Sequence, residues 1–271
     1  MGTGFRTIDG CRIWVEDTGG DGPIVAMSHG LLWSAEMYRP QIDALAGQYR
    51  VIAWDHRGQG RSDVPEGRSV SIEQVTSDAI AILEPLGQPV HFVGLSMGGF
   101  VGMRVAARRP ELVRSLVILE SAADPEPTAH LPKYGRLMWA ARLLGVRRWL
   151  ARQVLGIMCA EAFVSDPARA DDVERLTLAL MDNRRSIYKA VRGVLEREAC
   201  EEELAHIRCP TAVMHGTGDR AIARERARAM FERIEGAVWV DIQDAGHTST
   251  LEQPEAVTAA LIAFLDGVAT A

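Results

Sequence analysis

The stretch VHFVGLSMGGFVGMRVAARR, residues 90–109, decides the fold class of this chain. Its first four residues form a short apolar run typical of a buried parallel strand, and a helical pattern begins at Gly98. Between them, Gly94-Leu95-Ser96-Met97-Gly98 fits the pattern GxSxG, in which a serine occupies a sharp turn from strand to helix. We therefore expect Ser96 to project above the edge of a sheet, beside a helix N-terminus that favours negative charge.

Short apolar runs alternate with helical patterns along much of the rest of the chain. This order predicts an α/β fold, in which a parallel sheet carries helices on both faces. The expected strands are Arg12–Glu16, Ile24–Met27, Val51–Trp54, Val90–Val93, Leu116–Leu119, Thr211–His215 and Val238–Ile242, and the expected helices are Ala35–Leu45, Ile72–Leu86, Gly98–Ala107, Arg224–Arg233 and Pro254–Leu265.

The alternation stops between residues 122 and 206, where four helical patterns and no convincing strand occur. Ser165-Asp166-Pro167 is a good helix start, since a capping side chain stands just ahead of a proline. Without a repeat or a low-complexity linker, residues 122–206 are expected to form a helical cap inserted into one core of residues 1–121 and 207–271. The expected cap helices are Lys133–Leu144, Arg147–Met158, Pro167–Met181 and Arg184–Glu198.

Composition narrows the classes of protein to be considered. The 271 residues are 47% hydrophobic and 24% charged with a net charge of −6, which favours an ordinary globular protein and argues against a nucleic-acid partner. No apolar run is long enough to span a membrane, and the N-terminus lacks the core of a signal peptide. The four cysteines form no CxxC pair, and the seven histidines show no metal-binding spacing. We expect a cytoplasmic monomer or homodimer that acts on a small molecule, with no metal, cofactor or membrane partner.

A serine hydroxyl becomes a useful nucleophile only when a base removes its proton and a carboxylate orients that base. Asp219 follows one expected strand and His247 follows the next, so both fall where functional loops gather in such sheets. Taken singly, Asp219 could be a turn residue and His247 a surface histidine. The order Ser96, Asp219, His247 and the matching strand-end positions favour a catalytic triad, with Asp124 as the alternative acid.

An oxyanion hole is expected where the strand Ile24–Met27 runs into a loop through His29 and Gly30. The backbone N–H groups of Leu31 and Met97 are its predicted donors. Large apolar residues at helical spacing fill the cap, and some of them must roof the cleft, which suits a hydrophobic acyl group. The predicted substrate-binding residues are Trp33, Phe100 and Trp139. Five cap arginines could hold a carboxylate, but most are expected to lie on solvated helix faces: Arg136, Arg142, Arg147, Arg148 and Arg152.

Five sequence motifs are spread along nearly the whole chain: SHGLLWSAEMY (28–38), WDHRGQGRSD (54–63), GLSMGG (94–99), HGTGDRAI (215–222) and DAGHTSTLEQPE (244–255). Together they resemble those of the α/β-hydrolase superfamily. The resemblance implies a mostly parallel eight-stranded sheet with a helical cap, a triad of Ser96, Asp219 and His247, and an oxyanion hole at Leu31 and Met97. Within the superfamily the chain looks most like small bacterial carboxylesterases, enol-lactonases, acyl-homoserine lactonases and cofactor-free perhydrolases.

The leading hypothesis is a serine hydrolase that cleaves a carboxylic ester or lactone through an acyl-enzyme. Serine at the turn argues against epoxide hydrolases and haloalkane dehalogenases, which need a carboxylate nucleophile there. Three alternatives stay open: a carbon–carbon hydrolase of ring-cleavage diketones, a cofactor-free perhydrolase, and a non-catalytic ligand receptor of the same fold.

Overall fold

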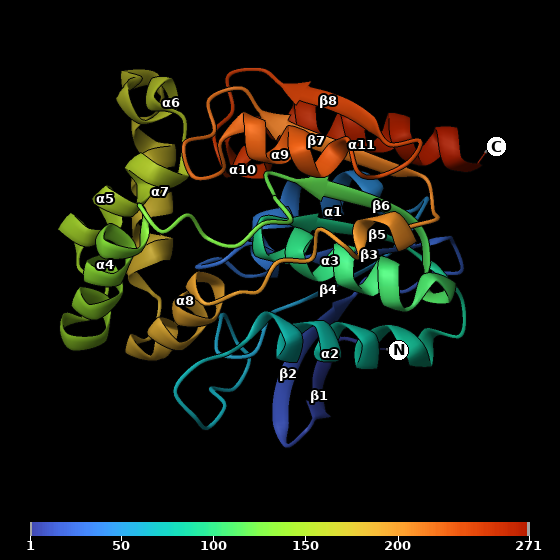
Figure 1. Ribbon diagram of the computed structural model, residues 1–271, viewed down its shortest axis with the longest axis horizontal. Coiled ribbons are helices and arrows are strands. Elements are labelled where there is room, and N and C mark those ends of the chain that lie inside the picture. Colours follow the sequence, from blue (N-terminus) through green and yellow to red (C-terminus); the bar gives the residue numbers. More distant parts are fainter. Residues whose placement is uncertain (1, 270–271) are drawn as a thin grey trace.

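A single eight-stranded sheet runs through the computed structural model, which describes residues 2–269 (Figure 1). The strand order is β1-β2-β4-β3-β5-β6-β7-β8; β2 is antiparallel to both of its neighbours, and the other pairs are parallel. The expected α/β class with a mostly parallel sheet is confirmed. The strands are β1 (Gly4–Ile8), β2 (Cys11–Asp17), β3 (Ile24–Ser28), β4 (Arg50–Trp54), β5 (Val90–Leu95), β6 (Val113–Leu119), β7 (Thr211–Gly216) and β8 (Val238–Ile242).

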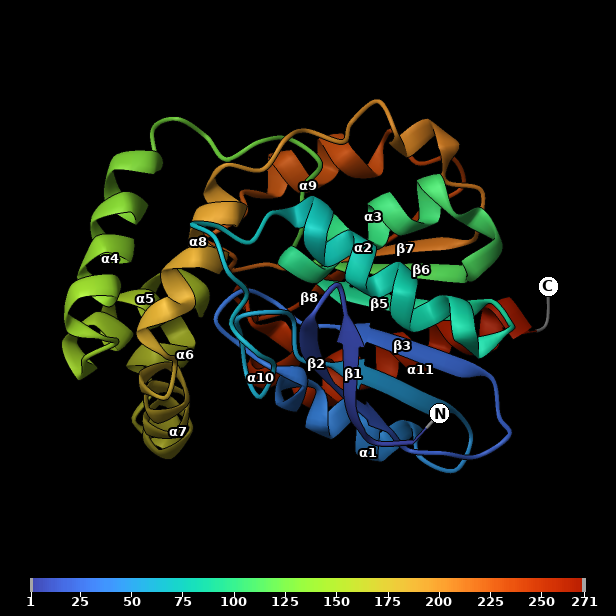
Figure 2. The same ribbon diagram turned by 90° about the horizontal axis from the view of Figure 1, so that it is seen from below.

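The central strands are apolar throughout because both faces of the sheet are covered. Alternate residues of a strand point to opposite faces, so Phe92 joins the core on one face while Val93 joins the core on the other. Helices α2, α3 and α9 cover the first face, and α1 and α11 cover the second (Figures 1 and 2). These helices and the short α10 are α1 (Arg39–Leu45), α2 (Ile72–Leu83), α3 (Met97–Arg108), α9 (Arg224–Phe231), α10 (Ser249–Glu252) and α11 (Pro254–Ala269).

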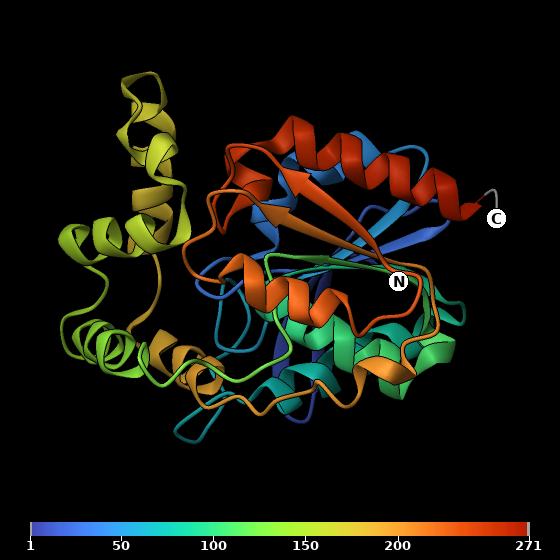
Figure 3. The ribbon, with the colours of Figure 1, turned by 45° about the horizontal axis from the view of Figure 1, so that its top comes forward.

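The five α-helices between β6 and β7 lie beyond the carboxyl ends of the parallel strands, to one side of the sheet (Figure 3). We call them the helical insertion. Its contacts with the core include hydrogen bonds from Asn183 Nδ2 to Leu32 O at 2.9 Å and from Arg184 Nη2 to Ser62 O at 2.7 Å. The insertion contains α4 (Leu131–Leu144), α5 (Arg148–Met158), α6 (Glu161–Ser165), α7 (Ala170–Met181) and α8 (Tyr188–Leu195).

Strand β1 and the short helices α6 and α10 were not expected from the sequence. Strand β1 lacks an apolar run and lies at the edge of the sheet, where it pairs only with β2. Its signal was the Asp9-Gly10 turn, in which both residues have positive φ, as a tight two-residue hairpin requires. Helix α6 is only five residues long and precedes the expected start signal, where the Asp166 carboxylate accepts a hydrogen bond from Ala168 N at 2.9 Å.

None of the helices within residues 2–269 combines the length and the apolar composition needed to cross a bilayer.

Candidate active site

Ser96 lies at the turn between β5 and α3, in a backbone conformation that few residues other than glycine adopt. Its φ is 51° and its ψ is −108°. The turn is anchored on both sides: Ser96 N donates to Leu119 O at 2.8 Å, and Ser121 Oγ donates to Ser96 O at 3.0 Å. Strained backbone persists only where its surroundings enforce it, so these bonds hold the serine at the edge of the sheet.

The two glycines of GLSMG are required by close backbone approach. A Cβ on Gly98 would lie 1.8 Å from Ser28 O, and a Cβ on Gly94 would lie 2.2 Å from Gly98 O. Any side chain at either position would therefore push α3 away from β3 or β5. The pattern around Ser96 thus encodes tight packing of the helix on the strands as well as the turn itself.

His247 and Asp219 complete a hydrogen-bonded line that ends at Ser96. His247 Nε2 lies 2.8 Å from Ser96 Oγ, and His247 Nδ1 lies 2.9 Å from Asp219 Oδ2. The other oxygen, Asp219 Oδ1, accepts the backbone N–H groups of Ala221 at 2.8 Å and Ile222 at 3.1 Å. With the proton on Nδ1, the imidazole donates to Asp219 and offers Nε2 as the acceptor for the serine proton.

The loop that carries His247 is held by Glu252, a buried residue that sequence reasoning missed. Its carboxylate accepts the backbone N–H groups on either side of the histidine, from Gly246 at 3.0 Å and from Thr248 at 3.1 Å. It also accepts Ala160 N of the helical insertion at 2.7 Å. Burial raises the pKa of Glu252, and these donors oppose the rise. No motif in the sequence marks Glu252, which lies five residues beyond His247 and two residues before Pro254.

A second buried carboxyl group lies behind the site. Glu120 follows β6 directly and accepts Gly216 N at 3.1 Å. Burial raises the pKa of Glu120 well above its usual range, and the nearby charge of Asp219 adds to the rise. Asp124, the alternative acid, forms no hydrogen bond with His247. Its carboxylate instead forms a bidentate ion pair with Arg226 at 2.8 and 2.9 Å.

Of the two predicted oxyanion donors, Met97 adjoins Ser96 in the chain and Leu31 lines the same cavity as Ser96. Met97 is the first residue of α3, where a helix leaves its backbone N–H groups without intrahelical partners. Leu31 follows β3 and lines the cavity that Ser96 also lines. His29 shapes the loop that follows β3 and leads to Leu31. Its Nε2 accepts a hydrogen bond from His56 N at 2.9 Å, and its Nδ1 donates to Gly30 O at 2.7 Å. Burial lowers the pKa of His29, which favours the neutral form that this pattern of bonds needs.

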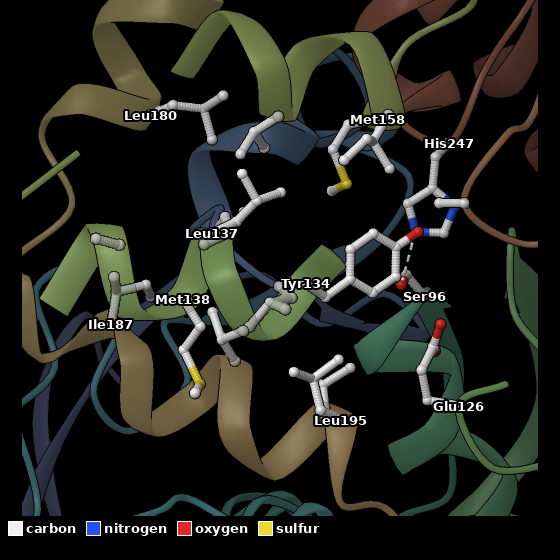
Figure 4. A pocket seen from close by; sticks show the side chains of 18 of the residues that line it. Ser96, Glu126, Tyr134, Leu137, Met138, Met158, Leu180, Ile187, Leu195 and His247 are labelled. Carbon is white, nitrogen blue, oxygen red and sulfur yellow. Dashed lines mark hydrogen bonds between the residues drawn. The ribbon is translucent and has the colours of Figure 1, made fainter. Parts of the chain in front are cut away.

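Ser96 and His247 open into a cavity of about 140 Å³ between the core and the helical insertion. Figure 4 shows apolar side chains from the insertion around the cavity and the Ser96–His247 pair at one end. The lining is almost entirely apolar, which suits an acyl or alkyl group more than a charged one. Its apolar residues are Leu31, Leu32, Phe100, Leu137, Met138, Ala141, Val146, Leu150, Val154, Ile157, Met158, Leu180, Ile187, Val191, Val194, Leu195, Ala221 and Ile222.

Three polar side chains also line the cavity near its catalytic end. Tyr134 of α4 points its hydroxyl toward Ser96 and His247 (Figure 4). Glu126 accepts a hydrogen bond from Arg197 Nη1 at 2.9 Å, and both side chains are almost fully buried. Because Tyr134 shares a helix face with Leu137 and Met138, its helical spacing could have identified it.

Of the three predicted substrate-binding residues, only Phe100 lines the cavity. Trp33 does not line this cavity: Leu32, with a φ of 73°, precedes it, and Trp33 packs into the core beside α1. Trp139 does not line it either, because this residue lies on the outer side of α4, where it is 50% exposed. Large apolar residues occur on both sides of α4, so helical spacing alone could not show which side faces the cavity.

The chain belongs to the serine aminopeptidase S33 family, whose model matches residues 22–253. The fold and the family together establish it as an α/β-hydrolase, as its motifs indicated. It is 26% identical to the protein named "Putative carbamate hydrolase RutD" from Pseudomonas savastanoi pv. phaseolicola, and the match covers 91% of this chain and 95% of that protein.

The similar solved structures include a lactonase and an esterase. An enol-lactonase from Burkholderia xenovorans LB400 superposes with a TM-score of 0.88 at 26% identity, covering 97% of this chain and all of the other. A thermophilic esterase from Thermogutta terrifontis superposes with a TM-score of 0.85 at 28% identity, covering 95% and 94%. The resemblance to the esterase and lactonase group of α/β-hydrolases is therefore confirmed.

Proposed function

We propose that this protein hydrolyses a carboxylic ester or lactone with an apolar acyl group, through an acyl-enzyme at Ser96. The observation that carries the proposal is the line from Ser96 Oγ to His247 Nε2 at 2.8 Å and from His247 Nδ1 to Asp219 at 2.9 Å, which ends in an apolar cavity. The enol-lactonase and the esterase among its structural neighbours support the same class of substrate.

In this mechanism Ser96 Oγ attacks the carbonyl carbon of the substrate while His247 takes the serine proton. The resulting oxyanion receives hydrogen bonds from the backbone N–H groups of Leu31 and Met97. His247 then gives its proton to the leaving oxygen, the bond between the carbonyl carbon and that oxygen breaks, and the acyl group stays on Ser96. Water then attacks the acyl carbon while His247 takes one of its protons. The bond from that carbon to Ser96 Oγ breaks, His247 returns the proton to Oγ, and the acid leaves.

The cavity supports the preference for an apolar acyl group. Burying apolar substrate surface against leucine and methionine side chains contributes roughly 25 cal/mol per Å², or about 0.8 kcal/mol for each methylene group. An acyl chain that extends from Ser96 toward Leu180 and Ile187 should therefore gain affinity with length until the cavity is full (Figure 4).

Carbamate hydrolysis is a second candidate, because of the name of the relative from Pseudomonas. A serine nucleophile can attack a carbamate carbonyl with the same groups, and the leaving group decides between the two activities. The polar cluster of Tyr134, Glu126 and Arg197 near the catalytic end offers hydrogen-bonding groups for a polar substituent.

The test compares p-nitrophenyl esters of increasing acyl length, a panel of lactones and an N-alkyl carbamate, with the Ser96→Ala variant as the blank. The expected result is kcat/KM rising with acyl length and then falling once the cavity is filled, with the Ser96→Ala variant lowering kcat by about 10⁴-fold or more. Turnover near the wild-type rate in Ser96→Ala, or a preference for charged acyl groups, would refute the proposal.

A further inference from the structure

The outer face of helices α4 and α5 differs from the rest of the chain in charge. Residues 127–160 contain six basic side chains and no aspartate or glutamate. The rest of the chain holds 24 basic and 36 acidic side chains. The six basic residues are Lys133, Arg136, Arg142, Arg147, Arg148 and Arg152.

The same segment also exposes an unusual number of large apolar side chains. Eight large apolar side chains are exposed among the described residues, and five of them lie between residues 131 and 149. Single exposed apolar residues are ordinary, but a cluster on one face usually marks an interaction surface. The five are Leu131, Trp139, Leu143, Leu144 and Trp149, of which Leu143 is 64% exposed and Trp139 is 50% exposed.

Helix α4 separates this surface from the catalytic cavity. Tyr134, Leu137, Met138 and Ala141 of α4 line the cavity, so they occupy one side of the helix. Residues 136, 139 and 143 follow the same spacing on the opposite side, and all three are exposed. Figures 1 and 2 place α4 at the outer edge of the molecule, so its exposed side faces away from the core.

The basic residues are only partly neutralised by neighbours. Arg148 and Arg152 form ion pairs with Glu174 at 2.5 and 3.4 Å. Arg142 packs its guanidinium over the ring of Trp139 at 4.8 Å. Lys133, Arg136 and Arg147 form no ion pair with any of residues 2–269. These three charges are therefore free to meet an anionic partner.

We propose that the outer face of α4 and α5 docks on an anionic lipid surface. Trp139, Leu143 and Trp149 would enter the headgroup region, where amphipathic rings are favoured, and Lys133, Arg136 and Arg147 would pair with lipid phosphates. This combination of basic and apolar groups is what an anionic bilayer surface complements. A symmetric dimer through the same face would bring six cations against six, which disfavours a second copy as the occupant.

The sequence-based expectation of no membrane partner rested on the lack of an apolar run that could span a bilayer, and docking on a surface needs no such run. The proposal does not depend on the hydrolase activity. Because α4 is about 10 Å thick, docking would bring the bilayer within one helix diameter of the catalytic cavity.

The test is co-sedimentation of the full chain with phosphatidylcholine vesicles, with and without phosphatidylglycerol. Binding is expected only with phosphatidylglycerol, and it should weaken as salt is raised. The variant Lys133→Gln/Arg136→Gln/Arg147→Gln should bind about 100-fold more weakly, since each basic residue contributes about fivefold, or about 1 kcal/mol. The variant Trp139→Ser/Leu143→Ser should also bind more weakly.

The matched control is Arg114→Gln/Arg208→Gln/Arg233→Gln, which removes three exposed charges at the opposite end of the strands. It should retain vesicle binding, as should Ser96→Ala, whose loss of turnover is a separate result. No binding to anionic vesicles, or equal loss in the control, would overturn the proposal. A dimer that Trp139→Ser/Leu143→Ser dissociates, without vesicle binding, would assign the face to a second copy instead.

Discussion

Asp219→Asn changes one atom of the proposed triad, and the structure determines which way the new amide must face. Asp219 Oδ1 accepts two backbone N–H groups, from Ala221 and Ile222, while Oδ2 faces His247. Only the carbonyl oxygen of an asparagine can accept those two bonds. Its NH₂ group is therefore turned toward His247 Nδ1.

An NH₂ group at that position donates to Nδ1, so the imidazole proton moves to Nε2. Nε2 lies 2.8 Å from Ser96 Oγ, and once protonated it can no longer take the serine proton. We expect kcat to fall by about 10⁴-fold, which corresponds to about 5 kcal/mol of transition-state stabilisation. The fold should be unaffected because the bonds to Ala221 and Ile222 remain.

The measurement is kcat for the best p-nitrophenyl ester, together with the melting temperature of each variant. Asp124→Asn is the matched control, since it makes the same chemical change at a carboxylate that pairs with Arg226. That control should keep kcat within a few-fold of wild type. A kcat for Asp219→Asn within tenfold of wild type, with a larger loss in Asp124→Asn, would refute the assignment of Asp219.

Three further predictions concern the turn at Ser96, the loop of His247 and the buried histidine of β5. Gly98→Ala should lower the free energy of unfolding by about 3 kcal/mol, or prevent folding, because its Cβ would meet Ser28 O. The control Gly156→Ala, in open space within α5, should raise the free energy of unfolding by up to about 1 kcal/mol. Denaturant titrations measure both changes, and equal effects of the two substitutions would contradict this account. Glu252→Gln should cut kcat by about tenfold with little change in KM, because its NH₂ group faces the N–H donors around His247; an unchanged kcat would remove Glu252 from the positioning of that loop. Burial lowers the pKa of His91 to about 4, so below pH 6.5 the unfolded chain binds a proton that the folded protein does not. The free energy of unfolding should therefore fall by up to about 3 kcal/mol between pH 6.5 and 4, and His91→Gln should flatten this slope; an identical slope in the variant would show that other groups cause it.

The turn at Ser96 could be located from the sequence because each part of it follows from local packing. The apolar run from Val90, the two glycines and the helix after Ser96 are all consequences of one strand packing against one helix. The order of Asp219 and His247 after successive strands was readable for the same reason, since parallel strands gather their carboxyl ends at one edge.

The lining of the cavity could not be predicted in the same way. Which side of α4 faces inward depends on how the insertion sits over the core, and both sides of that helix carry large apolar residues. Trp139 was expected to face the substrate for that reason, whereas the structure places Tyr134 there. Glu252 was missed because its role comes from backbone groups of Ala160 and Gly246, which spacing along the chain does not reveal.

The most direct test of the central claim is to label the protein with a fluorophosphonate, which reacts much faster with an activated serine than with other side chains, and to find the modified residue by mass spectrometry. We predict a single adduct on Ser96 that is absent in Ser96→Ala and forms far more slowly in His247→Ala, although both variants remain folded. No adduct on the wild-type protein, or an adduct on another residue, would contradict the claim that Ser96 is the nucleophile.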